Sequence, residues 1–429
     1  MRRNFLAAIA LFCGTSSYAG GFQLNTQSVR AMGIGGANTA WVFDPSINFY
    51  NPAGLTRLSG LQFYGGVHYI IPSVSLQTAV YDNIDQTTPN ANPIHFYASY
   101  RLNDKIGIGF GVNNQFGSTS SFEDDWQGRY IVQNISLTTF MFQPSIAYQI
   151  HEKISLGAGF VLTSGAFNTQ KAIPLSSSDN LYGQATLEGS GKAFGGNFGI
   201  LVDVFQNEKF DVSWGADYRT SLAVNLPEGT ARFTDIPNSL RETFPESTTF
   251  SGGLTLPMVA TSGIKIGYRL NENVQLTALY DFNYTGWSSY DTLSFDFAHE
   301  GTPDSETPKN WQNTVTHRIG LDICIKEKFS VRGGIYIDKT PIPDGFVSPE
   351  LPDADITGFT SGLSFQASES INIDASFLYQ YAERTASLDI AEFEASYRRK
   401  ALVFGLGVQI KLNGKKEGAA ITPEETPSL

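Results

Sequence analysis

Long apolar runs, cysteine and basic side chains are all scarce in this sequence of 429 residues. Beyond residue 19, no stretch approaches the roughly 18 to 20 consecutive apolar residues that a transmembrane helix needs. If the chain crosses a membrane, strands must therefore cross it. Of the two cysteines, only Cys324 lies beyond residue 19, which excludes an intrachain disulfide in residues 20–429.

The first residues have the order of features found in a secretory signal peptide. Arg2 and Arg3 precede an apolar run over residues 5–13, and Ser17-Tyr18-Ala19 forms a small-x-small cleavage site. We expect export and cleavage after Ala19. Removing Arg2 and Arg3 from the 29 basic residues leaves 27 against 41 acidic ones, a formal charge of 27 − 41 = −14. This charge makes nucleic acid an unsuitable partner.

Motifs for catalysis are missing as well. The sequence contains no G-x-S-x-G, no H-E-x-x-H and no G-x-x-x-x-G-K-[ST] pattern. We therefore expect no enzyme, no metal site and no cofactor. One enzyme class stays open, an outer-membrane lipase that assembles a serine and a histidine from distant strands. The histidines are scattered, and we expect His95 and His317 to be polar residues that face a lumen.

After Gly60 the chain settles into segments in which apolar and polar side chains alternate. In residues 94–102, Ile94 and Phe96 alternate with His95 and Ser99, and residues 319–325, 371–380 and 402–412 repeat the pattern. A period of two predicts strands with one apolar face. A water-soluble β-sandwich would show the same alternation.

The lengths of the connections distinguish these two folds. Six short polar turns separate the alternating segments: Asn103-Asp104-Lys105, His151-Glu152-Lys153, Asn207-Glu208-Lys209, Asn271-Glu272-Asn273, Lys326-Glu327-Lys328 and Ser368-Glu369-Ser370. They divide the chain into seven pieces, each with two strand-like segments joined by a longer loop. Seven hairpins give an all-β fold, a 14-stranded antiparallel transmembrane β-barrel of the Gram-negative outer membrane.

The longer loops are acidic and rich in proline, as exposed connections are. They fall at about 78–91, 117–133, 172–190, 234–249, 298–311, 339–355 and 385–392. We expect them to face outside the cell, with both termini on the periplasmic side. The predicted organisation is a signal peptide at 1–19, an N-terminal plug or hatch in the lumen at 20–58, the barrel at 59–412 and a polar periplasmic tail at 413–429.

Residues 20–58 lack the alternation of the later strands, and this is why we assign them to the lumen and not to the wall. Two polar residues in this segment permit two interpretations. Asp44-Pro45 and Asn51-Pro52 are either two surface turns, which composition alone favours, or buried groups that fix an irregular segment by binding backbone donors.

The same segment resembles the amino-terminal hatch of the FadL-type family, the bacterial outer-membrane transporters of long-chain fatty acids and aromatic hydrocarbons. The resemblance rests on Gly21-Phe22-Gln23-Leu24-Asn25, the cluster at 33–36, Asp44 and Asn51-Pro52-Ala53-Gly54. Leu254-Thr255-Leu256-Pro257, Tyr284-Thr285-Gly286-Trp287-Ser288 and residues 332–343 add to it. It covers nearly all of residues 20–412 and makes Asp44, Asn51, Pro52, Ala53 and Gly54 the expected hatch and gating residues.

The resemblance also implies a route for the cargo. The barrel is expected to be a monomer in contact with outer-membrane lipid and lipopolysaccharide. Hydrophobic small molecules are captured at the outer loops and released sideways through a kink in the third strand. Candidate lining residues from the hatch are Phe22, Leu24, Phe43, Ile47, Phe49 and Tyr50, and candidate kink residues are Gly107, Gly109, Gly111, Asn113 and Asn114.

The identity of the cargo is less closely specified. Long-chain fatty acids are expected first and aromatic hydrocarbons second. Where family members place basic side chains for the carboxylate, this chain has Ala166 and Ser294; the candidate substitutes are Lys171, Lys192, Arg219 and Lys265. A structural or adhesin barrel is the other alternative from a different class.

Overall fold

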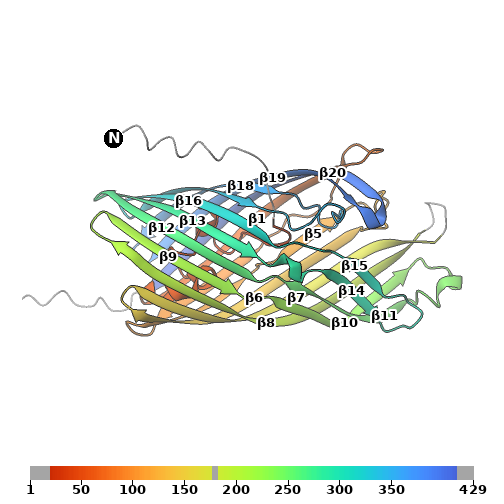
Figure 1. The fold of residues 1–429 in the computed structure, drawn as a ribbon, viewed down its shortest axis with the longest axis horizontal. Coiled ribbons are helices and arrows are strands. Elements are labelled where there is room, and N and C mark those ends of the chain that lie inside the picture. The colour runs from red at the N-terminus through yellow and green to blue at the C-terminus, as the bar shows by residue number, and fades with distance from the viewer. Residues whose placement is uncertain (1–19, 176–181, 413–429) are drawn as a thin grey trace, which may run out of the picture.

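The computed structural model describes residues 20–175 and 182–412, so the predicted signal peptide and the predicted tail lie outside the described residues. Within the described ranges, fourteen antiparallel strands pair side by side into a ring (Figure 1). In order around the ring they are β1 (Leu61–Gln77), β3 (Ile94–Arg101), β4 (Ile106–Asn113), β6 (Asn134–His151), β7 (Ile154–Pro174), β8 (Tyr182–Gln206), β9 (Phe210–Arg219), β12 (Val259–Asn271), β13 (Val274–Thr285), β16 (Thr314–Ile325), β17 (Phe329–Asp338), β18 (Ile356–Ser368), β19 (Ile371–Leu388) and β20 (Phe393–Leu412). Because β1 pairs with both β3 and β20, the ring is closed and the predicted barrel is confirmed.

The six short turns join consecutive strands at one end of the ring, as predicted. Residues 103–105, for example, connect β3 to β4, and residues 207–209 connect β8 to β9. Leu61 at the start of β1 pairs with Leu412 at the end of β20. The first and last residues of the barrel wall therefore lie at this end too.

At the other end, additional strands extend the wall beyond the ring. They are β2 (Ile84–Asp85), β5 (Gly117–Ser121), β10 (Leu222–Thr234), β11 (Ser247–Leu256), β14 (Thr292–Phe297) and β15 (Ser305–Pro308). The loop predicted at 172–190 is wrong, because β7 and β8 continue to Pro174 and Tyr182 and bury Ala185 and Leu187 on the inner face. The loop predicted at 117–133 likewise begins with a strand, β5.

The helices of the described residues are all short. They are α1 (Val29–Met32), α2 (Ile47–Tyr50) and the 3-10 helices η1 (Pro52–Arg57), η2 (Asn238–Leu240), η3 (Trp287–Ser289) and η4 (Asp389–Ala391). None of them has the length and apolar character to cross a membrane. The first three lie in the N-terminal segment, residues 20–58.

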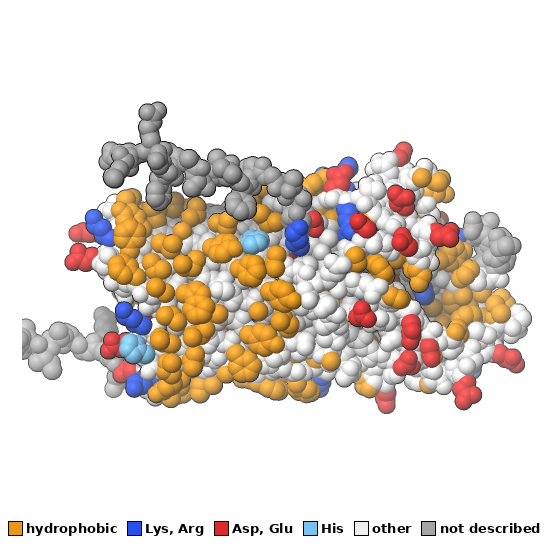
Figure 2. All heavy atoms as spheres, in the orientation of Figure 1, with side chains coloured by type: hydrophobic (Ala, Val, Ile, Leu, Met, Phe, Trp, Pro, Cys, Tyr) orange, Lys and Arg blue, Asp and Glu red, His pale blue; other side chains and the backbone are white. Residues whose placement is uncertain are grey.

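Alternation along each strand separates an outer from an inner face of the wall. Ile94 and Phe96 are exposed, whereas His95 is buried, as predicted. His317 is a correction: it stacks on the exposed Tyr280 on the outer face, because inward positions of β16 are the even-numbered ones such as Arg318. Figure 2 shows the hydrophobic side chains gathered over the half of the barrel that carries the short turns, and acidic side chains over the other half.

The barrel interior has two chemically different parts. Towards the extended end, aromatic and aliphatic side chains such as Trp126, Phe250 and Trp287 form one large cluster. Towards the short turns, the inner wall carries buried polar and charged groups, including Asp281 and Asp374. The N-terminal segment lies inside the ring (Figure 1) and is hydrogen-bonded to several of these groups, including Asp281 through Thr39.

Candidate functional site

The N-terminal segment is hydrogen-bonded to strands on all sides of the ring. The bonds reach β1, β3, β6, β8, β9, β13, β16, β18 and β20, through Tyr64, Tyr97, Gln143, Ile200, Arg219, Asp281, Arg318, Thr360 and Gln409 respectively. Buried backbone groups in an irregular segment need such partners. The polar inner face of the wall thus supplies the hydrogen-bond partners that the irregular segment cannot provide for its own backbone.

Asn51 is fully buried and uses both ends of its side-chain amide. Its Nδ2 donates to the carbonyl oxygens of Thr39 and Ile200, both at 2.9 Å, and its Oδ1 accepts from the amide of Ala53 at 3.2 Å. Two of these bonds fold the segment on itself, and the bond to Ile200 ties it to β8. The environment is not that of a surface turn.

Pro52, Ala53 and Gly54 begin helix η1, which packs against glycines of the wall. Gly157 on β7 faces the backbone of Ala53 so closely that a methyl group at position 157 would overlap it. Gly54 is similarly confined, because a side chain there would overlap Ile47. The small residues on both sides let the segment and the wall approach at backbone distance.

Asp44 is buried beside the same segment and is incompletely paired. Its Oδ1 accepts from the amide of Ser46 at 2.7 Å, and within the described residues its Oδ2 has no hydrogen-bond partner. Burial raises the pKa of Asp44 to about 6, against the opposing effects of Ser46 and Arg30. An ionised Asp44 is therefore costly in the seated segment.

An apolar cavity of about 60 Å³ lies beneath the longer loops. Phe22 lines it and packs against four aromatic rings, with centroid distances of 4.9 Å to Trp287, 5.6 Å to Tyr290, 5.4 Å to Trp311 and 6.0 Å to Phe116. Leu137 and other residues of the wall complete its lining. The side chain of Phe22 thus packs into an aromatic pocket that is chemically suited to an apolar ligand.

One ion pair borders this apolar cavity. Lys309 Nζ lies 2.7 Å from Glu350 Oε2, with the two side chains 10% and 20% exposed. Burial acts to lower the pKa of Lys309, but Glu350 and Tyr290 outweigh it and the pKa is raised. Lys309 is thus a charged group at the edge of an apolar pocket, already matched by a carboxylate.

The candidate lining residues of the hatch occupy several environments. Phe22 is in the apolar cavity and Leu24 lines a second cavity beside it. Phe49 and Tyr50 line a polar cavity. Ile47 packs with Leu55, and Phe43 packs with Trp41, in two separate small clusters. The structure therefore does not bring these six residues together around one ligand site.

The third strand of the wall is interrupted at Asn114–Phe116, between β4 and β5. β4 pairs with β3 as far as Asn113, whereas β5 pairs with β6 alone. The interruption is thus not at Gly107, Gly109 and Gly111, which lie in the regular part of β4. These glycines instead make room for the N-terminal segment and a neighbouring ring: a Cβ at each would lie 2.5 Å from Leu55 O, 2.6 Å from Asn48 Oδ1 and 2.7 Å from Tyr97 Cδ1 respectively.

The N-terminal segment pairs with the interrupted stretch of the third strand. Leu24 N donates to Gln115 O at 2.9 Å, and Gly117 N donates to Phe22 O at 3.0 Å. On the outer side of these bonds lies a cavity of about 380 Å³ between β1, β5 and β6. Residues 22–24 therefore act as an antiparallel neighbour of residues 115–117, beyond the point where β3 stops pairing with the third strand.

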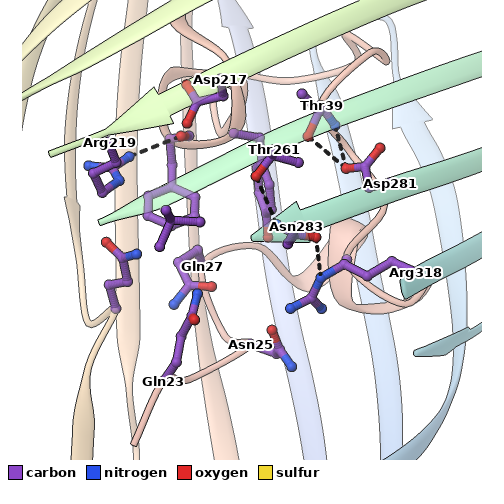
Figure 3. Close-up of a pocket in the computed structure, with 15 residues that line it drawn as sticks. Gln23, Asn25, Gln27, Thr39, Asp217, Arg219, Thr261, Asp281, Asn283 and Arg318 are labelled. Atoms are coloured by element: carbon purple, nitrogen blue, oxygen red, sulfur yellow. Dashed lines mark hydrogen bonds between the residues drawn. The ribbon is translucent and has the colours of Figure 1, made fainter. Parts of the chain in front are cut away.

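A polar cavity of about 40 Å³ lies on the inner side of the same residues. Gln23 and Gln27 face Arg219 and Arg318 across it, with Asp281 nearby (Figure 3). Arg219 donates to Phe49 O at 3.1 Å and Arg318 to Gly35 O at 3.1 Å. Phe22, Gln23 and Leu24 thus line the apolar, the polar and the side cavity in turn.

The family model for "Outer membrane protein transport protein (OMPP1/FadL/TodX)" matches residues 10–412. The chain belongs to this family. It is an outer-membrane β-barrel, and its relatives in the OMPP1/FadL/TodX family are transport proteins and channels. The resemblance noted from the sequence is confirmed.

Relatives and solved structures of the OMPP1/FadL/TodX family match almost the full length. The long-chain fatty acid transport protein of Salmonella typhi is 24% identical over 432 residues, covering 94% of this chain and 97% of the relative. A Pseudomonas aeruginosa FadL homologue superposes with a TM-score of 0.78 at 17% identity, covering 91% of this chain and 100% of the other. The Pseudomonas putida toluene transporter TodX gives 0.68 at 14% identity, covering 93% and 100%. These structures share the fold of this chain.

Several residues of this family member's apolar cavity were missed from the sequence. Tyr290, Lys309 and Trp311 line the cavity, and Trp287 packs beside it against Phe22. The three rings come from two connections between strands, and Lys309 precedes Trp311 by two residues. Three aromatic residues and one lysine lie within 25 positions, in a chain with few tryptophans. This cluster is a sequence signal that a search for strand alternation does not detect. Trp287 had been noted only as part of a matching motif.

The basic residues considered for a carboxylate lie elsewhere. Arg219 lines the polar cavity, and Lys265 pairs with Asp211 near the short turns. Lys171 and Lys192 are exposed. Within the described residues, no group of three or more His, Cys, Asp or Glu side chains is arranged to hold a metal ion.

Proposed function

We propose that this protein is a passive, monomeric outer-membrane channel for hydrophobic small molecules, with long-chain fatty acids as its first cargo. The observation that carries the proposal is the position of residues 22–24, which line three cavities in turn and pair with the interrupted stretch of the third strand. The relatives from Salmonella typhi and Escherichia coli, both named long-chain fatty acid transport proteins, support the choice of cargo.

Capture begins at the apolar cavity. Its volume of about 60 Å³ is far below the roughly 300 to 1,000 Å³ of sites that enclose a small molecule. Displacement of the Phe22 ring enlarges the cavity, because that ring occupies the space between Trp287, Tyr290 and Trp311. A cargo molecule replaces the apolar contacts of Phe22 with its own, so the exchange exposes little additional apolar surface to water.

Release follows from the same movement. Displacement of Phe22 strains the bonds that join residues 22–24 to Gln115 and Gly117. Breaking them connects the interior with the side cavity of about 380 Å³, which adjoins the outer surface between β1 and β6. The cargo then leaves sideways towards lipid, a downhill path that needs no energy source. The Asn51 seat keeps the remainder of the segment, the hatch, in the lumen.

Lys309 is the cationic group that we assign to the carboxylate of a fatty acid. It borders the apolar cavity, and its present partner, Glu350, is itself a carboxylate. A cargo carboxylate takes the place of Glu350 with the same charge-assisted geometry. An uncharged hydrocarbon gains nothing from Lys309, so this residue separates the two cargo classes.

The test is uptake of labelled oleate and labelled toluene by cells that express the wild type, Lys309→Met or the control Lys192→Met, an exposed lysine on β8. At equal barrel abundance we expect Lys309→Met to reduce oleate uptake at least tenfold, to leave toluene uptake unchanged, and Lys192→Met to change neither. Wild-type oleate and toluene uptake equal to that of cells lacking the barrel would contradict the transport function.

Aromatic hydrocarbons are the second candidate cargo. The apolar cavity and its surroundings favour them. Tyr290 and Trp311 in the lining, with Trp287 packed beside them, offer ring faces and edges to an aromatic ligand, and Lys309 is already paired. Toluene uptake that exceeds oleate uptake, with no effect of Lys309→Met on either, would favour this cargo. A lipase or an adhesin barrel predicts no barrel-dependent uptake of either.

A further inference from the structure

Two basic side chains lie together on the outward face of β20. Arg398 and Lys400 are exposed, while Arg399 between them turns inward and binds Asp353 at 2.9 Å. The register places Lys400 between Tyr381 of β19 and Ser73 of β1. The pair therefore faces what surrounds the barrel and not its lumen.

The height of this pair on the wall follows from the residues below it. Towards the short turns, the outward side chains of β20 include the exposed Phe404, Leu406, Val408 and Ile410. Residues 402–412 span about 25 Å along the barrel axis, given a rise of about 3.3 Å per residue and a tilt of about 40°. This equals the height of the apolar band of an outer-membrane barrel, so Lys400 and Arg398 lie at its outer edge.

Arg398 and Lys400, counted together with the neighbouring Glu383, carry a net positive charge in a chain whose net charge is negative. Arg398 Nη2 lies 3.5 Å from Oε1 of Glu383 on the neighbouring strand β19, and both side chains are about half exposed. Lys400 Nζ lies 6.0 Å from the ring centre of Tyr381, and no carboxylate of the described ranges lies within ion-pair distance of it. One basic charge is thus left without an acidic partner at the boundary between apolar wall and polar loops.

We propose that Arg398 and Lys400 bind a phosphate group of a phosphorylated glycolipid, the lipid A part of lipopolysaccharide, in the outer leaflet. Its acyl chains lie along the apolar side chains from Phe404 to Ile410, and its phosphate reaches the two basic groups. The hydroxyl groups of Ser73 and Ser75, opposite Lys400 and Arg398 in the register, are further donors. The inference rests on the outer-membrane location and not on the identity of the cargo.

Native mass spectrometry of the full-length barrel in detergent tests this site. The probes are bisphosphorylated lipid A, its dephosphorylated form and inorganic phosphate. The double variant R398Q/K400Q should weaken the binding of bisphosphorylated lipid A at least tenfold. The matched control R232Q/K192Q should bind as the wild type does; it also removes an exposed arginine that lies 3.5 Å from a glutamate, Glu188, and an exposed lysine.

Three outcomes would overturn the proposal. They are equal binding of lipid A by R398Q/K400Q and the wild type, equal binding of the dephosphorylated form, and binding of inorganic phosphate as tight as that of lipid A. A gel shift between heated and unheated samples checks that both variants are folded. Cargo uptake should be unchanged in R398Q/K400Q, so that a failure of this site and a failure of the transport function remain distinguishable.

Discussion

Replacement of Asn51 by alanine tests whether the hatch is held in the barrel by a few buried hydrogen bonds. The substitution leaves Thr39 O and Ala53 N without their partner in a buried place, and Ile200 O without its partner in a partly buried one. At about 1 kcal/mol for each lost bond, the seated state of the hatch loses about 3 kcal/mol. Because 1.4 kcal/mol is a factor of ten, the unseated population rises about a hundredfold.

Hydrogen exchange measured by mass spectrometry reports this population directly. In Asn51→Ala, the amides of residues 38–58 should exchange up to about a hundredfold faster, while those of β16 to β20 keep their rates. Cargo uptake at equal abundance should change too, since gating depends on the hatch in our proposal.

The control is Asn207→Ala in a short turn. Asn207 Oδ1 also accepts two backbone hydrogen bonds, from Lys209 at 2.9 Å and Phe210 at 2.7 Å, but it is exposed and water replaces it. Exchange in residues 38–58 that is the same in Asn51→Ala and in the wild type would refute the reasoning, whatever the uptake.

Three further changes test the same contacts. Gly157→Ala should unseat helix η1 and accelerate exchange there, whereas Gly65→Ala, whose nearest neighbour atom would be 3.7 Å away, should not. Cysteines at positions 24 and 117, joined by a short bismaleimide in a background without Cys324, should stop uptake, which each single cysteine variant retains. Burial raises the pKa of Asp44 to about 6, above the roughly 4 of an exposed carboxyl, so protonation stabilises the seated hatch. Amide exchange of the hatch, corrected for intrinsic rates, should therefore slow as pH falls from about 7 to about 4. The free energy of hatch opening should rise by up to about 3 kcal/mol over this range, and Asp44→Asn should lack this pH dependence.

The wall of the barrel was predictable because each strand repeats a local rule. Alternation and short polar turns depend only on neighbouring residues, so β3 and the turn at 103–105 followed directly from the sequence. The boundary errors have a local cause as well. Polar residues around 182–190 suggested a loop, but their alternate positions face outward while Ala185 and Leu187 pack inside.

The candidate site was less predictable because its contacts join residues far apart in the chain. The glycines of β4 illustrate this, because a glycine in a strand is compatible either with a kink or with the close approach of another segment. For Gly107, only the position of Leu55 in the structure shows that close approach is the explanation. The pocket around Phe22 depends in the same way on Trp287 and Trp311, which come from different connections.

Two kinds of chemistry hold the hatch, and they respond differently to an apolar cargo. Phe22 is held by aromatic contacts, for which an apolar cargo competes, whereas Asn51 is held by hydrogen bonds, for which such a cargo offers no partner. Cargo binding should therefore free residues 20–24 and leave the seat around Asn51 closed. Saturating oleate is expected to accelerate amide exchange at residues 22–24 and at Gly117 but not at residues 44–54. Faster exchange throughout 20–58 would instead mean that the whole hatch leaves the lumen and that Asn51 is part of the moving element.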